Sequence, residues 1–104
     1  MPKYRVDISE PAEDDLRDIV RYISSQLNAP ITAMSMMETT EDTLSKLSDM
    51  PDHCPIVRDE RLADMGYRRL KIKSYTAFFS VNEKDKVVDV ERILHSRRDW
   101  ASLL

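Results

Sequence analysis

Apolar and charged residues alternate at the start of the chain. Tyr4, Val6 and Ile8 are separated from one another by single charged residues. A period of two is typical of a strand that buries one face and exposes the other. The sequence therefore predicts a first strand over residues 4–8, with the three apolar side chains directed toward the core.

A first helix is predicted to begin near Glu10. Ser9 is a suitable N-cap, and Pro11 falls in the first turn, where a missing N–H group costs nothing. The apolar residues that follow recur every three or four positions and so form one stripe along the helix. They are Ala12, Leu16, Ile19, Ile23 and Leu27. This stripe is expected to pack on a sheet or on another helix.

A second helix is predicted from its cap at Asn28 to Met50, where the following proline forces a stop. Four of its apolar residues keep a helical spacing, namely Met34, Met37, Leu44 and Leu47. Because only a few residues connect the two helices, they must lie antiparallel as a hairpin. The methionines at 34, 36 and 37 are interpreted as flexible core residues, with a partner-binding face as the alternative.

Three consecutive strands are predicted after Gly66, the only glycine, which allows a turn out of the charged loop before it. They are expected around residues 69–73, over 75–81 and over 86–94. The predicted fold class is α+β, in the order β-α-α-β-β-β and as one domain over residues 1–104. The helical hairpin would pack on one face of a mainly antiparallel sheet of about four strands, leaving the other face free to bind.

The charge is distributed unevenly along the chain. The net charge is −3, but residues 1–52 hold five Lys and Arg against eleven Asp and Glu, whereas residues 53–104 hold eleven against eight. Such a change of sign between halves indicates a local site for an anionic partner. No apolar run is long enough to span a bilayer and no signal peptide is recognisable, so no membrane partner and a cytoplasmic location are expected. Neither a cofactor nor a metal is predicted, because Cys54 and His53 have no further zinc ligands near them.

Positive charge gathers in the three predicted strands. Arg69, Lys71 and Lys73 alternate with apolar residues and are therefore expected to share one strand face. Arg68 precedes them, and the last predicted strand runs into His95, Arg97 and Arg98, so positive charge comes from both ends of the three-strand segment. Two interpretations stay open at this point. The cations form an anion-binding surface, or they form a solvated face that pairs with Asp89 or Glu91 on the last strand.

Several segments, in this order and spacing, carry a resemblance along nearly the whole chain: Y-R-V-D-I-S-E-P-A-E-D-D-L, I-V-R-Y-I, V-R-D-E-R-L, G-Y-R-R-L and V-E-R-I-L-H-S-R-R-D-W. The chain resembles the RelE/ParE superfamily of bacterial toxins. The resemblance implies a small α+β toxin of a type II toxin–antitoxin system. Its cognate antitoxin would wrap the toxin in a hetero-oligomer and block its active surface.

The resemblance implies one of two activities. RelE-like members are ribosome-dependent endoribonucleases that cut mRNA in the A site, whereas ParE-like members bind DNA gyrase and are not nucleases. Cleavage without a metal needs cations to stabilise the charge that develops as the 2′-hydroxyl attacks the phosphate. We expect mRNA cleavage as the main function and gyrase inhibition as the alternative. A third interpretation is an inactive toxin that survives as a binding module of an operon repressor.

The resemblance also assigns roles by position. Arg69 and Lys71 match basic strand residues of the catalytic site, Arg97 matches a phosphate-contacting arginine, and His95 is the expected acid or base. The predicted substrate-binding residues are Arg68, Lys73, Arg98 and Trp100.

Each role has an alternative, and one position departs from the nuclease pattern. His95 would instead close a strand, Trp100 would anchor the C-terminal tail and not stack on a base, and the arginines at 97 and 98 would contact the antitoxin. Thr76 stands where many RelE-like nucleases carry an arginine. No carboxylate obviously supplies a base in its place.

Overall fold

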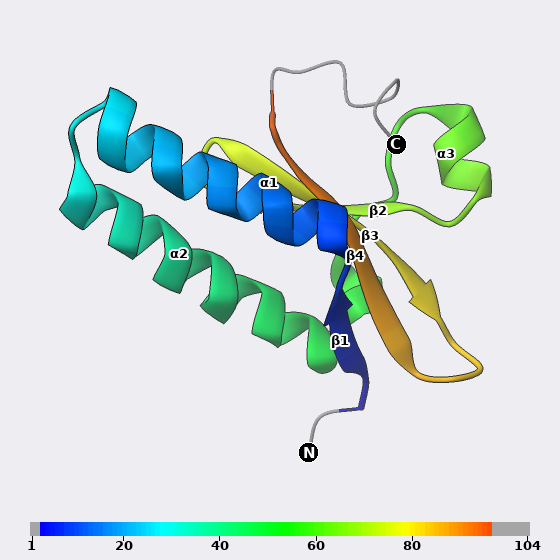
Figure 1. Ribbon diagram of the computed structural model, residues 1–104. Coiled ribbons are helices and arrows are strands. Elements are labelled where there is room, and N and C mark those ends of the chain that lie inside the picture. The colour runs from blue at the N-terminus through cyan, green and yellow to red at the C-terminus, as the bar shows by residue number, and fades with distance from the viewer. Residues whose placement is uncertain (1–2, 97–104) are drawn as a thin grey trace.

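The computed structural model describes residues 3–96, and its elements follow the predicted order (Figure 1). They are β1 (Arg5–Ile8), α1 (Glu10–Arg21), α2 (Pro30–Ser45), α3 (Glu60–Asp64), β2 (Arg68–Ile72), β3 (Tyr75–Asn82) and β4 (Val87–His95). A π-helical turn over Tyr22–Gln26 extends α1, and 3-10 turns cover Lys46–Ser48 and Pro51–His53. The predicted α+β class is confirmed, with α3 added in the loop before β2.

The four strands form one mixed sheet in the order β1-β4-β3-β2. β1 is parallel to β4, and the other two pairs are antiparallel. β3 lies between β2 and β4, so the cations on β2 are not cross-strand neighbours of Asp89 or Glu91. The interpretation that these cations pair with the two acids of the last strand is therefore wrong. Lys73 is also corrected, since β2 ends at Ile72 and Lys73 occupies the turn to β3 with a φ of 56°.

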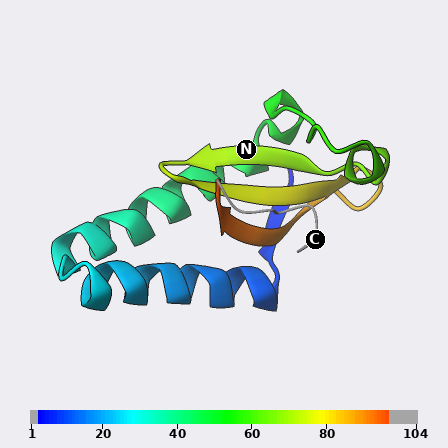
Figure 2. The same ribbon diagram turned by 90° about the horizontal axis from the view of Figure 1, so that it is seen from above.

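The helical hairpin covers one face of the sheet, and its turn projects beyond the strands (Figure 2). Between helices and sheet lies the main core, which is formed by Tyr4, Ala12, Ile19, Ile23, Ala33, Met36, Leu44, Leu47, Ile72, Ala77, Phe79, Val88, Val90 and Ile93. Ser9 caps α1 by accepting a hydrogen bond from the Ala12 amide at 3.1 Å. The predicted stripe of α1 is therefore confirmed up to Ile23, whereas Leu27 is exposed at the projecting turn.

The buried stripe of α2 differs from the predicted one. Met36 is 2% exposed, whereas Met34 is 66% exposed and Met37 also faces solvent. The helix instead turns Ala33 and Thr40 inward, and the Thr40 hydroxyl donates to the Met36 carbonyl at 2.7 Å. A hydroxyl satisfied in this way can be buried at little cost. The prediction is confirmed for Leu44 and Leu47, which are buried, and was wrong for Met34 and Met37, because a small residue and a threonine do not stand out in an apolar pattern.

A second, smaller core lies on the opposite face of the sheet. Val57, Leu62, Phe78 and Leu94 are buried together there, under α3 and the loop before it. Asp59 caps α3 by accepting a hydrogen bond from the Leu62 amide at 3.0 Å. The expectation that this face is free is therefore corrected: α3 covers part of it, and the uncovered part is the site described below.

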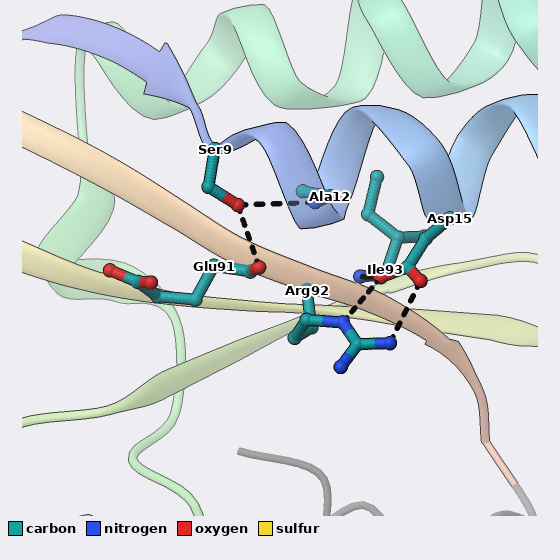
Figure 3. Close-up of polar contacts among 6 residues, drawn as sticks. All are labelled: Ser9, Ala12, Asp15, Glu91, Arg92 and Ile93. Carbon is teal, nitrogen blue, oxygen red and sulfur yellow. Dashed lines mark hydrogen bonds and ion pairs between the residues drawn. The ribbon is translucent and has the colours of Figure 1, made fainter.

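The first turns of α1 replace β1 along the edge of β4 (Figure 3). β1 pairs with β4 only as far as Val90. Beyond that point the Ser9 hydroxyl donates to the Glu91 carbonyl at 2.8 Å, and an Asp15 carboxylate oxygen accepts from the Ile93 amide at 3.0 Å. The same carboxylate binds the Arg92 guanidinium through two hydrogen bonds of 2.7 and 2.9 Å and raises the pKa of Arg92. α1 is thereby fixed to the sheet.

Replacing Asp15 by alanine should lower the free energy of unfolding by about 2 kcal/mol, because Ile93 and Arg92 lose the same half-buried acceptor. Urea denaturation followed by circular dichroism measures the change. Asp14→Ala is the matched control, since Asp14 pairs with Arg17 at an exposed position of the same helix and should cost less than about 0.5 kcal/mol. Equal losses in the two variants would contradict this account of α1.

Candidate functional site

Two adjoining hollows lie where α3 leaves the sheet uncovered, the first on the face that carries Arg69 and Lys71, and the second at the end of the sheet, beside the turn from β2 to β3. The first has a volume of about 550 Å³ and is lined by His53, Cys54, Pro55, Arg58, Arg69, Leu70, Lys71, Thr76, Phe78 and Ser96. The second has a volume of about 450 Å³ and is lined by Lys71, Lys73, Ser74, His95 and Ser96. Lys71 and Ser96 line both hollows, so the two are neighbours, and we call them together the cationic groove.

Strand alternation places the central residues of the groove. Arg69 lies opposite Phe78 and Lys71 opposite Thr76 in the β2–β3 register, so all four side chains share one face. Phe78 is 2% exposed and closes the bottom of the groove, since it packs under Leu62 of α3. The predicted common face of Arg69 and Lys71 is thus present in the structure.

The loop before α3 forms the outer wall of the groove. The Arg69 amide donates to the Pro55 carbonyl at 3.0 Å, and the Arg68 guanidinium donates to the Cys54 carbonyl at 2.6 Å. These bonds hold Arg58 beside β2. Arg68 lines neither hollow. Its guanidinium anchors the loop instead. Burial raises the pKa of the Cys54 thiol, so the thiol form is favoured there.

The other end of the groove is formed where β3 and β4 meet. The Thr76 and Ser96 hydroxyl groups are 2.8 Å apart and form a hydrogen bond. His95 lies opposite Tyr75 in the register, and the two rings meet edge to face with centroids 5.3 Å apart. His95 thus lines the second hollow together with Lys71 and Lys73.

The structure brings four of the predicted site residues into the groove, namely Arg69, Lys71, Lys73 and His95. The predicted residues Arg97, Arg98 and Trp100 lie outside the described residues. The sequence analysis missed His53, Arg58, Ser74 and Ser96 as groove residues. A basic residue in the loop after Pro55 was the only available signal for Arg58, since the docking of that loop on β2 depends on long-range hydrogen bonds.

The chemistry of the groove is that of an anion-binding surface. Arg58, Arg69, Lys71 and Lys73 supply positive charge, and no Asp or Glu is found among the described residues that line either hollow. The Arg69 Nε atom is buried and has no hydrogen-bond partner within residues 3–96. The same part of the chain contains no cluster of three or more side chains that could hold a metal ion. It also has no helix long and apolar enough to cross a membrane.

Comparisons with known structures show the same fold in toxin–antitoxin complexes. The chromosomal ParDE toxin–antitoxin system from P. aeruginosa matches with a TM-score of 0.74 and 18% identity, over 89% of this chain and 96% of that chain. The RelBE2 complex from Mycobacterium tuberculosis has a TM-score of 0.61 and 19% identity, over 91% and 99%. The archaeal RelE–RelB complex from Pyrococcus horikoshii has a TM-score of 0.61 and 17% identity, over 92% and 98%.

Comparison of the sequence with family models identifies one family, whereas the structural matches include both ParDE and RelBE complexes. A search of curated protein sequences finds no match. The model described as "ParE toxin of type II toxin-antitoxin system, parDE" matches residues 6–100, which is nearly the whole chain. This match confirms the resemblance to the RelE/ParE superfamily found in the sequence. The chain therefore belongs to the ParE toxin family of type II toxin–antitoxin systems.

Proposed function

We propose that this toxin inhibits DNA gyrase and does not cleave mRNA. The observation that carries the proposal is the ParE family match over residues 6–100, because ParE-like members of the superfamily bind gyrase. This reverses the order of the two activities expected from the sequence alone, where mRNA cleavage came first.

The position of Thr76 supports the same choice. Where many RelE-like nucleases carry an arginine, this chain has a hydroxyl that is already hydrogen-bonded to Ser96. Metal-independent cleavage needs preorganised charge at the phosphate and a group that removes the 2′-hydroxyl proton. The described residues of the groove include neither an arginine at position 76 nor a carboxylate, which leaves the imidazoles of His53 and His95 as candidate bases. The groove therefore suits binding of an anion better than cleavage.

A cognate antitoxin is the proposed second partner. The ParDE and RelBE structures with the same fold are toxin–antitoxin complexes. On this chain, Leu27, Ile31 and Met34 expose 56%, 83% and 66% of their surface on the helical hairpin. Exposed apolar side chains grouped on one element are typical of a protein–protein interface. We infer a toxin–antitoxin hetero-oligomer in which the antitoxin neutralises the toxin.

Purified toxin should abolish the supercoiling activity of gyrase on relaxed plasmid DNA, and prior addition of the antitoxin should restore it. In cells, induction of the toxin should give filaments and a DNA-damage response, because a blocked gyrase leaves DNA topology unbalanced. Gel electrophoresis of plasmid topoisomers measures the effect. Normal supercoiling at a toxin concentration that arrests growth would contradict the proposal.

Ribosome-dependent mRNA cleavage is the second candidate, and the cationic groove is the observation that favours it. Under the gyrase proposal, primer extension of a reporter mRNA should give the same ends with and without induced toxin. If new ends appear within translated codons and are lost in Lys71→Ala, the second candidate is correct and the gyrase proposal is wrong. Lys84→Ala, in the turn between β3 and β4, is the matched control outside the groove.

A further inference from the structure

We propose that the cationic groove binds the phosphodiester backbone of duplex DNA. The inference rests on the proposed function in one respect: the DNA concerned is the segment that gyrase holds while the toxin is bound to it. The toxin would then contact both components of a gyrase–DNA complex, the enzyme through one surface and the DNA through the groove.

The groove cations have no carboxylate partners in the described part of the chain. Ion pairs in the described part of the chain involve Arg5, Arg17, Lys86 and Arg92, none of which lines the groove. The four groove cations form no ion pair with a carboxylate within residues 3–96. Like charges held close together repel one another, and an anionic ligand removes that repulsion. An unpaired group of this kind in a chain of net charge −3 indicates a binding site.

The charged surface is elongated. The cations follow one another through both hollows, with Arg58 on the loop wall, Arg69 and Lys71 on β2, and Lys73 in the turn. A small anion would need donors that converge on one point. Cations spread along two neighbouring hollows instead match the repeated phosphates of a nucleic-acid backbone.

The groove also contains hydroxyl groups that can donate hydrogen bonds. Phosphate oxygens in protein–DNA complexes accept from hydroxyl groups as well as from arginine and lysine. Within the Thr76–Ser96 pair, one hydroxyl donates to the other. The accepting hydroxyl keeps its own proton for an outside acceptor. Ser74 adds a further hydroxyl to the second hollow. The groove thus offers neutral donors between its cations.

The scarcity of exposed aromatic rings in the groove favours duplex DNA over single-stranded RNA. Proteins that hold single strands stack the bases on exposed aromatic rings. Among the described residues of the groove, Phe78 is the only Phe, Tyr or Trp and its ring is 2% exposed, while the His95 ring already packs edge to face on Tyr75. Bases already stacked within a duplex need no such ring. The groove therefore fits the outside of a double helix better than an unstacked strand.

The test measures binding of the full-length toxin to a short fluorescein-labelled DNA duplex by anisotropy over a range of salt concentrations. Lys71→Gln and Arg58→Gln remove groove cations at exposed positions, so the fold is expected to stay intact. Each should weaken binding on the order of tenfold at low salt and reduce the slope of log K against log salt by about one. Lys84→Gln, the same type of change at the far end of β3, should leave both values unchanged.

Gyrase assays with the same variants separate this inference from the proposed function. Capture of DNA-free gyrase by Lys71→Gln should equal that by the wild-type toxin, whereas inhibition of supercoiling should weaken at least severalfold. If both groove variants keep the wild-type slope of log K against log salt and inhibit supercoiling fully, the inference is wrong and the proposed function stays intact. A wild-type toxin that fails to bind gyrase would instead overturn the proposed function, whatever the variants do.

Two competitors identify the ligand class. Unlabelled duplex should displace the labelled duplex at lower concentration than single-stranded RNA or polyglutamate of equal charge. If the RNA competes better, the groove is an RNA site and the inference is wrong. If polyglutamate competes equally well, the groove recognises charge on an acidic peptide, and the inference is wrong in that case too.

Discussion

The edge of β4 beyond Val90 is the part of the sheet on which the rest of the structure depends. β1 is too short to pair with the whole of β4, so the backbone of residues 91–93 would lie unpaired between sheet and helix. Buried backbone groups without partners are costly. Ser9, the N-cap of α1, and Asp15, in its second turn, supply those partners. One short segment therefore ends the parallel pairing, begins the helix and fixes the hairpin against the sheet.

The same region of β4 contains a bulge that determines which residues reach the groove. The register shifts between Phe78 and Phe79, so that Phe78 faces Arg92 while Phe79 faces Val90. An extra residue in one strand reverses the alternation of side chains beyond it. Val90 and Ile93 both face the helices for this reason. Beyond the bulge Leu94 faces the second core, so alternation puts His95 on the helix side of the sheet and Ser96 on the side of Thr76.

These two features explain what the sequence could and could not predict. The common face of Arg69 and Lys71 follows from a period of two within a single strand, which needs no tertiary information. The bulge cannot be read from the alternation, and the residues beside it, Arg92 and Ile93, bind Asp15, which lies far from them in the chain. The position of Arg58 has the same origin, since hydrogen bonds from β2 carry its loop to the groove.

The distribution of charge limits how such a groove can act. Four cations line it, but the chain as a whole carries a net charge of −3, with acids exposed along α1 at Glu10, Glu13, Asp14 and Asp18. Under the proposal of DNA binding, a duplex would attract the groove and repel the acidic helix, so the toxin would have one favourable orientation on DNA and a weak affinity for it. Weak and oriented binding is of little use to a protein that must find DNA alone. It suits a toxin that meets DNA already held by an enzyme, because contacts with that enzyme supply the remaining binding energy.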